Sequence, residues 1–166
     1  MALAAVALAA CGRAPDFWVH GAAVYVETDA PFARAPDVQQ RVETTVDAAL
    51  RYFGGDWSAL AGRSLTLEGT PYVACDGASG ALGCWDGAIR VTTRDPGTGT
   101  VACVEETVLV HEVGHAVLGD RLHEDPRWMD LRPVAEALAG RAGYGRDGPV
   151  PCTIYPSVWR HPLGSP

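Results

Sequence analysis

The chain has 166 residues, a formal net charge of -7 and 48% hydrophobic residues. This length suits one domain with a single buried core and is short for two. Affinity for nucleic acids is built from basic side chains that neutralise phosphates, so the acidic balance and the lack of a Lys/Arg cluster argue against a nucleic-acid partner.

The first ten residues carry no charged side chain and form an apolar run. A membrane-spanning helix needs about 20 apolar residues, so we interpret residues 1–10 as a signal peptide. The end of this run, Leu8 to Gly12, resembles the lipobox of bacterial lipoproteins. The resemblance implies that Cys11 is lipidated and becomes the mature N-terminus. We therefore expect an exported lipoprotein of the cell envelope, on its periplasmic or outer face. The alternative is a secreted protein with an ordinary cleaved signal peptide.

Residues 11–30 are expected to hold a linker and a first strand, because Phe17–Thr28 is rich in β-branched and aromatic side chains. The range 31–166 continues as one domain. An amphipathic helix is predicted after Asp37, its N-cap, and before Gly54, where it stops. Its apolar residues recur at steps of three and four: Val38, Val42, Val46, Ala49, Leu50 and Phe53.

Apart from Cys11, the chain has four cysteines: Cys75, Cys84, Cys103 and Cys152. An even number in an exported protein predicts two disulfides, for which three pairings exist. We favour Cys75 with Cys84, because the turn-rich segment between them can fold back tightly, and this leaves Cys103 with Cys152. A zinc site made of cysteines is disfavoured, because the sequence has no Cys-x-x-Cys pair.

The remaining elements are two strand regions followed by two helices. Arg63–Cys75 alternates loosely and Ala88–Thr93 more clearly between apolar and polar residues, which indicates strands. A helix is predicted from Glu105 to Leu118, with a stop at Gly119, and another from about Asp130 to Gly140. This order predicts an α+β domain in which a small mixed sheet packs on two long helices.

The first of these two helices reads His111-Glu112-Val113-Gly114-His115. Residues four apart share one helix face, so His111 and His115 can present their imidazoles to one tetrahedral Zn²⁺ ion. Glu112 is offset by about a hundred degrees, so its carboxylate can serve as the catalytic base without binding the metal. The motif therefore predicts a catalytic zinc centre.

The segment from His111 to Met129 resembles the metzincin clan of zinc peptidases. Their pattern is His-Glu-x-x-His-x-x-Gly-x-x-His, followed by a turn with a Met beneath the metal. The resemblance implies a minimal zincin-like catalytic domain in which Gly119 turns the chain back. In such a domain His123 is the third zinc ligand and Met129, in the Met-turn, forms the floor of the site.

Gly119 and His123 come one and two positions later than in the clan pattern, so Asp120 and Glu136 stay open as alternative third ligands. The resemblance further implies an endopeptidase acting on a peptide or protein substrate, which could add to an exposed edge of the Ala88–Thr93 strand. We expect a monomer that contacts the membrane only through its lipid anchor. The alternative is a non-catalytic lipoprotein that zinc stabilises as a binding module.

Overall fold

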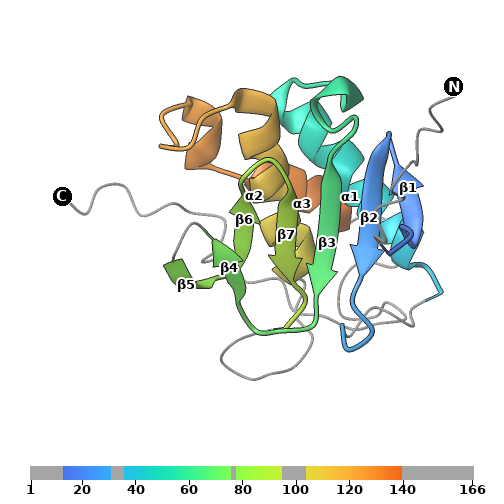
Figure 1. The fold of residues 1–166 in the computed structure, drawn as a ribbon. Coiled ribbons are helices and arrows are strands. Elements are labelled where there is room, and N and C mark those ends of the chain that lie inside the picture. Colours follow the sequence, from blue (N-terminus) through green and yellow to red (C-terminus); the bar gives the residue numbers. More distant parts are fainter. Residues whose placement is uncertain (1–12, 31–35, 76–77, 95–103, 140–166) are drawn as a thin grey trace, which may run out of the picture.

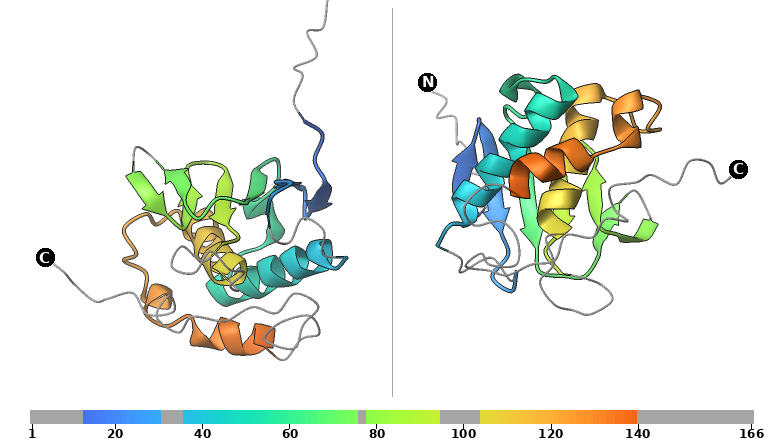
Figure 2. Two further views of the ribbon diagram at one scale, coloured as in Figure 1. Left: turned by 90° about the horizontal axis from the view of Figure 1, so that it is seen from below. Right: turned by 180° about the vertical axis from the view of Figure 1, so that it is seen from behind.

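A five-stranded mixed sheet with helices on one face forms the centre of the molecule. The computed structural model describes residues 13–30, 36–75, 78–94 and 104–139 (Figure 1). Helices α1 and α2 cover one face of the sheet, and α3 lies beyond them, away from the sheet (Figure 2). The predicted α+β class with a small mixed sheet is confirmed. The sheet order is β1, β2, β3, β7, β6, with bounds Phe17–Val19, Ala22–Val26, Ser64–Glu68, Ile89–Thr92 and Gly83–Trp85.

The three central strands run parallel, and both outer strands are antiparallel to their neighbours. Val24 of β2 lies opposite Leu65 of β3, and Leu65 lies opposite Ile89 of β7. Strand β7 is therefore interior, because it pairs with β3 on one side and β6 on the other. The expectation that the Ala88–Thr93 strand has an exposed edge is wrong. The short strand β6 occupies that edge and separates β7 from it.

The N-terminal segment forms a hairpin, whereas one continuous strand was predicted for Phe17–Thr28. Strands β1 and β2 pair antiparallel, with Val19 opposite Ala22. The two residues between them, His20 and Gly21, have φ values of 49° and 79°. Two successive positive φ values are the signature of a type I′ hairpin turn. The His20 ring also lies 2.6 Å from the Asp47 carboxylate, between Nε2 and Oδ1, which fixes this turn against α1.

Helix α1 (Val38–Phe53) has the predicted position and ends at Gly54, whose φ is 71°. Asp37 precedes the helix as predicted, but its side chain makes no capping hydrogen bond. Helix α2 spans Val104–Leu118, and α3 spans Arg132–Ala139. With 16 and 15 residues, α1 and α2 are not much longer than the helices of most globular domains, so the expectation of two long helices needs correction.

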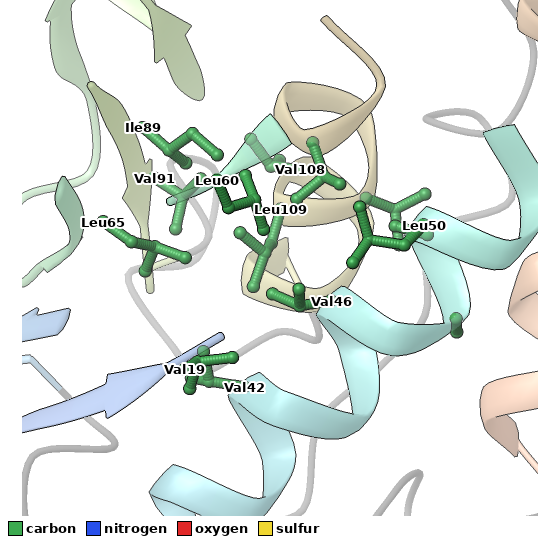
Figure 3. Packing of buried hydrophobic residues seen from close by; sticks show 14 of the residues in the cluster. Val19, Val42, Val46, Leu50, Leu60, Leu65, Ile89, Val91, Val108 and Leu109 are labelled. Carbon is green, nitrogen blue, oxygen red and sulfur yellow. The ribbon is translucent and has the colours of Figure 1, made fainter. Parts of the chain in front are cut away.

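The core lies between the sheet and these two helices. Figure 3 shows side chains of all three elements meeting there, among them Val46 and Leu50 of α1, Val91 of β7, and Val108 and Leu109 of α2. The two helices approach closely at the end of α1, where a Cβ on Gly55 would lie 2.6 Å from a methyl carbon of Val117. This packing fixes the orientation of α2 about its own axis, and with it the direction of the side chains on its other face.

A disulfide joins the edge of the large sheet to a small two-stranded sheet. Strands β4 (Val73–Cys75) and β5 (Ala78–Ala81) form that hairpin. Cys75 is bonded to Cys84 of β6, so the favoured pairing is confirmed. Cys103 and Cys152 lie outside the described residues, and so do Cys11 and the signal peptide predicted for residues 1–10. Within the described ranges, no helix combines the length and the apolarity that crossing a bilayer requires.

Replacing both Cys75 and Cys84 with serine should lower the free energy of unfolding by about 2–3 kcal/mol, because the cross-link closes a short loop in the unfolded chain. Urea denaturation followed by circular dichroism measures this change. An unchanged midpoint in the double variant would show that the cross-link adds no stability by restricting the unfolded chain.

Candidate metal centre

The second half of α2 carries two imidazoles on one face. The Nε2 atoms of His111 and His115 lie 3.1 Å apart. On the opposite face, Val110 and Val113 are fully buried in the core, so the helix cannot turn its histidines elsewhere. Gly119 ends the helix with a φ of 63°, and its N–H donates to the carbonyl of His115. A residue with a side chain is strained in this conformation, which explains the glycine at the turn.

His123 reaches the same place from the loop that follows. Its Nε2 lies 3.0 Å from Nε2 of His111, and one ring nitrogen of each of the three histidines lies within 4.8 Å of the others. We call His111, His115 and His123 the three-histidine site. His123 has a φ of 60°, a backbone conformation that costs a residue with a side chain of order 1–2 kcal/mol. The surrounding loop must therefore stabilise this conformation.

Asp120 supplies that stabilisation and does not join the cluster. Its Oδ1 accepts a hydrogen bond from the backbone N–H of Leu122, and its Oδ2 accepts one from the N–H of Asp125, both at 2.9 Å. The indole Nε1 of Trp128 donates to the same Oδ2 at 3.0 Å. These donors lower the pKa of Asp120, the Asp125 N–H most strongly. The carboxylate thus shapes the loop that delivers His123, a role different from the alternative ligand role considered for it.

The backbone of Asp120 fixes the tautomer of His115. The Asp120 carbonyl oxygen lies 2.6 Å from His115 Nδ1. A carbonyl oxygen only accepts, so Nδ1 carries the proton and donates it, and the lone pair of Nε2 is directed at the other two rings. A protonated Nδ1 bonded to a backbone carbonyl is the usual arrangement of histidines that bind metal through Nε2.

The nitrogen separations around His111 suit one shared metal ion. Ligands at 2.0–2.1 Å in a tetrahedron lie about 3.3 Å from each other, and Nε2 of His111 lies 3.1 Å from that of His115 and 3.0 Å from that of His123. Three imidazoles suit zinc and also other first-row divalent ions. Glu136, the remaining alternative ligand, lies on α3, and its side chain is outside the described residues.

Glu112 lines a pocket of about 330 Å³ together with His111 and His115 of the three-histidine site. Its side chain is only 5% exposed, and this burial raises the pKa of Glu112 to about 8. Strand β6 passes directly over it, since a Cβ on Gly83 would lie 2.5 Å from Oε1 of Glu112. Only a glycine leaves room for the carboxylate at this point. The pocket is lined by Cys75, Gly83, Cys84, Trp85, His111, Glu112, His115 and Arg121.

Arg121 closes the outer side of this pocket. The guanidinium donates a hydrogen bond to the backbone carbonyl of Trp85, at 3.0 Å. Trp85 is the last residue of the edge strand β6, so the contact links the loop after α2 to the sheet edge. The pocket therefore lies between the three-histidine site and the edge of the sheet.

Trp128, and not Met129, forms the floor of the site. The indole centroid lies 4.9 Å from the ring of His111, 4.8 Å from that of His115 and 4.7 Å from that of His123. Trp128 is 1% exposed, whereas Met129, the residue expected beneath the metal, is 46% exposed. Both residues belong to the 3-10 turn η2 (Pro126–Met129). In this tight turn the residue before the methionine points at the histidines.

The structure thus brings together His111, Glu112, His115 and His123 as the sequence predicts. Sequence reasoning missed Trp128, Gly83 and Arg121. The only sequence signal for Trp128 was an aromatic residue directly before the expected floor residue Met129. For Gly83 the sequence offered no clear signal, because the short segment Gly83–Trp85 resembles a loop and not a strand.

Replacing Gly114 with alanine should destabilise the protein by about 1–3 kcal/mol, although alanine favours helices. The new Cβ would lie 2.6 Å from ring atoms of both Phe53 and Trp128, so the floor must move. Chemical denaturation of the purified variant measures the change. A variant as stable as the wild type would mean that the indole does not pack under α2 as described.

Comparison with known proteins yields no relative. No protein-family model matches the chain, and neither does any curated protein or any solved structure.

Proposed function

We propose that this chain is a zinc-dependent metallopeptidase of the metzincin type that hydrolyses peptide bonds at the cell envelope. One observation carries the proposal: ring nitrogens of His111, His115 and His123 converge, and the first two of these histidines line one pocket with the buried carboxylate of Glu112. Catalytic zinc centres have three protein ligands and an open position, whereas structural centres use four. Among the residues whose side chains the structure describes, which do not include Glu136, the three histidines are the only cluster of potential ligands and no fourth residue belongs to it.

A zinc ion bound by the three histidines would supply Lewis-acid chemistry, which acidifies water and polarises a carbonyl oxygen. The rest of the mechanism belongs to the side chains of this chain. Glu112 accepts the proton of the attacking water and later donates it to the amine that leaves the peptide bond. His115 is held in the ligating tautomer by the Asp120 carbonyl, so its Nε2 is available without a prior proton shift.

The surroundings of the pocket support a peptide as substrate. The pocket lies along β6, the antiparallel edge strand, and includes all three of its residues. An extended peptide can pair with such an edge through main-chain hydrogen bonds, which places a backbone carbonyl beside the histidines and Glu112. The edge strand that would serve is β6, not the Ala88–Thr93 strand.

Location at the membrane is part of the proposal and rests on the lipobox-like sequence around Cys11. Only five residues separate Cys11 from Phe17, where β1 begins. Even fully extended, such a tether spans about 20 Å. A lipid on Cys11 would therefore keep the domain close to the membrane surface.

Purified wild-type protein should bind one zinc ion per chain, and His123→Ala should lose most of it, because two imidazoles alone leave the ion weakly held. Glu136→Ala should keep full stoichiometry. Elemental analysis after dialysis measures both. Zinc retained in His123→Ala but lost in Glu136→Ala would replace the metzincin-type ligand set with one that uses the α3 glutamate.

Glu112→Gln should bind zinc as the wild type does and cleave a peptide library about 10²–10⁴-fold more slowly, because general-base catalysis contributes that much. Glu124→Gln is the matched control, since Glu124 is an exposed glutamate of the following loop. Mass spectrometry of the library detects cleavage. If zinc-loaded wild type cleaves no peptide, the protein is better explained as a zinc-stabilised binding module.

A further inference from the structure

We propose that Trp128 is a positioning residue for the three-histidine site and that the Trp128–Asp120 hydrogen bond presets the imidazoles for the metal. The inference deepens the proposed function and rests on it. It concerns a residue that the metzincin resemblance does not point to, because the clan pattern places a methionine beneath the metal.

Trp128 contacts every ring of the three-histidine site. One indole packs against all three imidazoles, with centroid distances between 4.7 and 4.9 Å. The planes of Trp128 and His123 meet at 84°, an edge-to-face arrangement that aromatic rings favour. A rigid flat side chain in contact with all three rings limits the rotation of each. Because two of the rings come from α2 and one from the loop, the indole also sets their relative position.

The indole Nε1 of Trp128 also donates a hydrogen bond to Oδ2 of Asp120. The same aspartate holds the loop through the N–H groups of Leu122 and Asp125, and its carbonyl accepts the Nδ1 proton of His115. Asp120 therefore connects the indole with a ligand from the helix and with the turn that carries the loop ligand. A shift of the indole would be transmitted to both.

Contacts with α1 hold the indole in place. Phe53 of α1 packs on it at a centroid distance of 5.0 Å. The neighbouring Arg127 donates a hydrogen bond to the carbonyl of Phe53. The hydroxyl of Tyr52 lies 2.8 Å from the Arg127 carbonyl and 2.6 Å from that of Asp130. The turn η2 is thus bonded to α1 on both sides of Trp128.

The position of Trp128 also decides which side of the three-histidine site is open. The indole covers the three rings from the core side, where it is almost completely buried. The pocket that includes Glu112 touches His111 and His115 from the side of β6, and Trp128 does not line it. The side of the three-histidine site that is open to the pocket therefore faces Glu112 and the edge strand, and a substrate would approach a bound metal from there.

The test compares Zn²⁺ affinity in three variants, measured by competition with a chromogenic chelator. Trp128→Phe keeps an aromatic ring but loses the hydrogen bond to Asp120, and should bind Zn²⁺ about 10-fold more weakly. Trp128→Leu loses the ring as well, and the loss should approach about 100-fold, the upper range for groups that orient metal ligands. Met129→Leu, in the same turn but exposed, is the matched control and should bind as the wild type does.

Two further measurements separate positioning from general stability. The visible absorption of the Co²⁺-loaded protein reports ligand geometry, and it should change in Trp128→Phe even when the melting temperature of the metal-free protein does not. Co²⁺ should also quench tryptophan emission in Trp85→Phe, which removes the other indole of the pocket, and much less in the Trp85→Phe/Trp128→Phe double variant.

The outcomes are distinct. Wild-type affinity and an unchanged Co²⁺ spectrum in both Trp128 variants would overturn the positioning role and leave the zinc centre intact. A wild-type protein that binds neither Zn²⁺ nor Co²⁺ would overturn the proposed function and this inference together. A graded loss from Trp128→Phe to Trp128→Leu, with Met129→Leu unchanged, is the result expected.

Discussion

The candidate site depends on the chain reversal that directly follows α2. A helix presents residues four apart on one face, so it can supply two ligands without help, but a third must return from outside the helix. Gly119 makes this return possible by adopting a left-handed conformation, and Asp120 holds it through its carboxylate and its carbonyl. His123 reaches the site only in a backbone conformation, with a positive φ, that is unfavourable for a residue with a side chain. The site therefore depends on Asp120 in the loop as well as on the helix that carries the motif.

The sheet contributes an edge next to this reversal. Helices α1 and α2 both pack on one face of the three parallel strands. The short antiparallel strand β6 forms the edge of the sheet beside α2. The separation between edge and helix is small, because Gly83 contributes no side chain where Glu112 rises from the helix. The carboxylate is consequently enclosed by protein on the sheet side and open only toward the pocket. An acid in such surroundings exchanges a proton near neutral pH more readily than an exposed one does.

Sequence patterns predicted the elements whose causes are local. The 3.6-residue period and the glycine stop gave α1, and the spacing of His111 and His115 predicted their convergence, because both follow from helix geometry alone. The His20–Gly21 turn was missed, since a His at a positive φ is uncommon and the flanking residues read as one strand. Trp128 was missed for a different reason. Which of two neighbouring side chains points at the site depends on the pitch of a 3-10 turn and on packing against Phe53, and neither is written in a short motif.

The disulfide between Cys75 and Cys84 bears on the stage at which the pocket is completed. Both half-cystines line the pocket beside Glu112, so one wall is joined covalently to the hairpin next to it. Thiols stay apart in the glutathione-buffered interior of a cell and pair once a protein reaches an oxidising compartment. If the chain is exported as proposed, this wall of the pocket would be joined covalently only after the protein reaches an oxidising compartment.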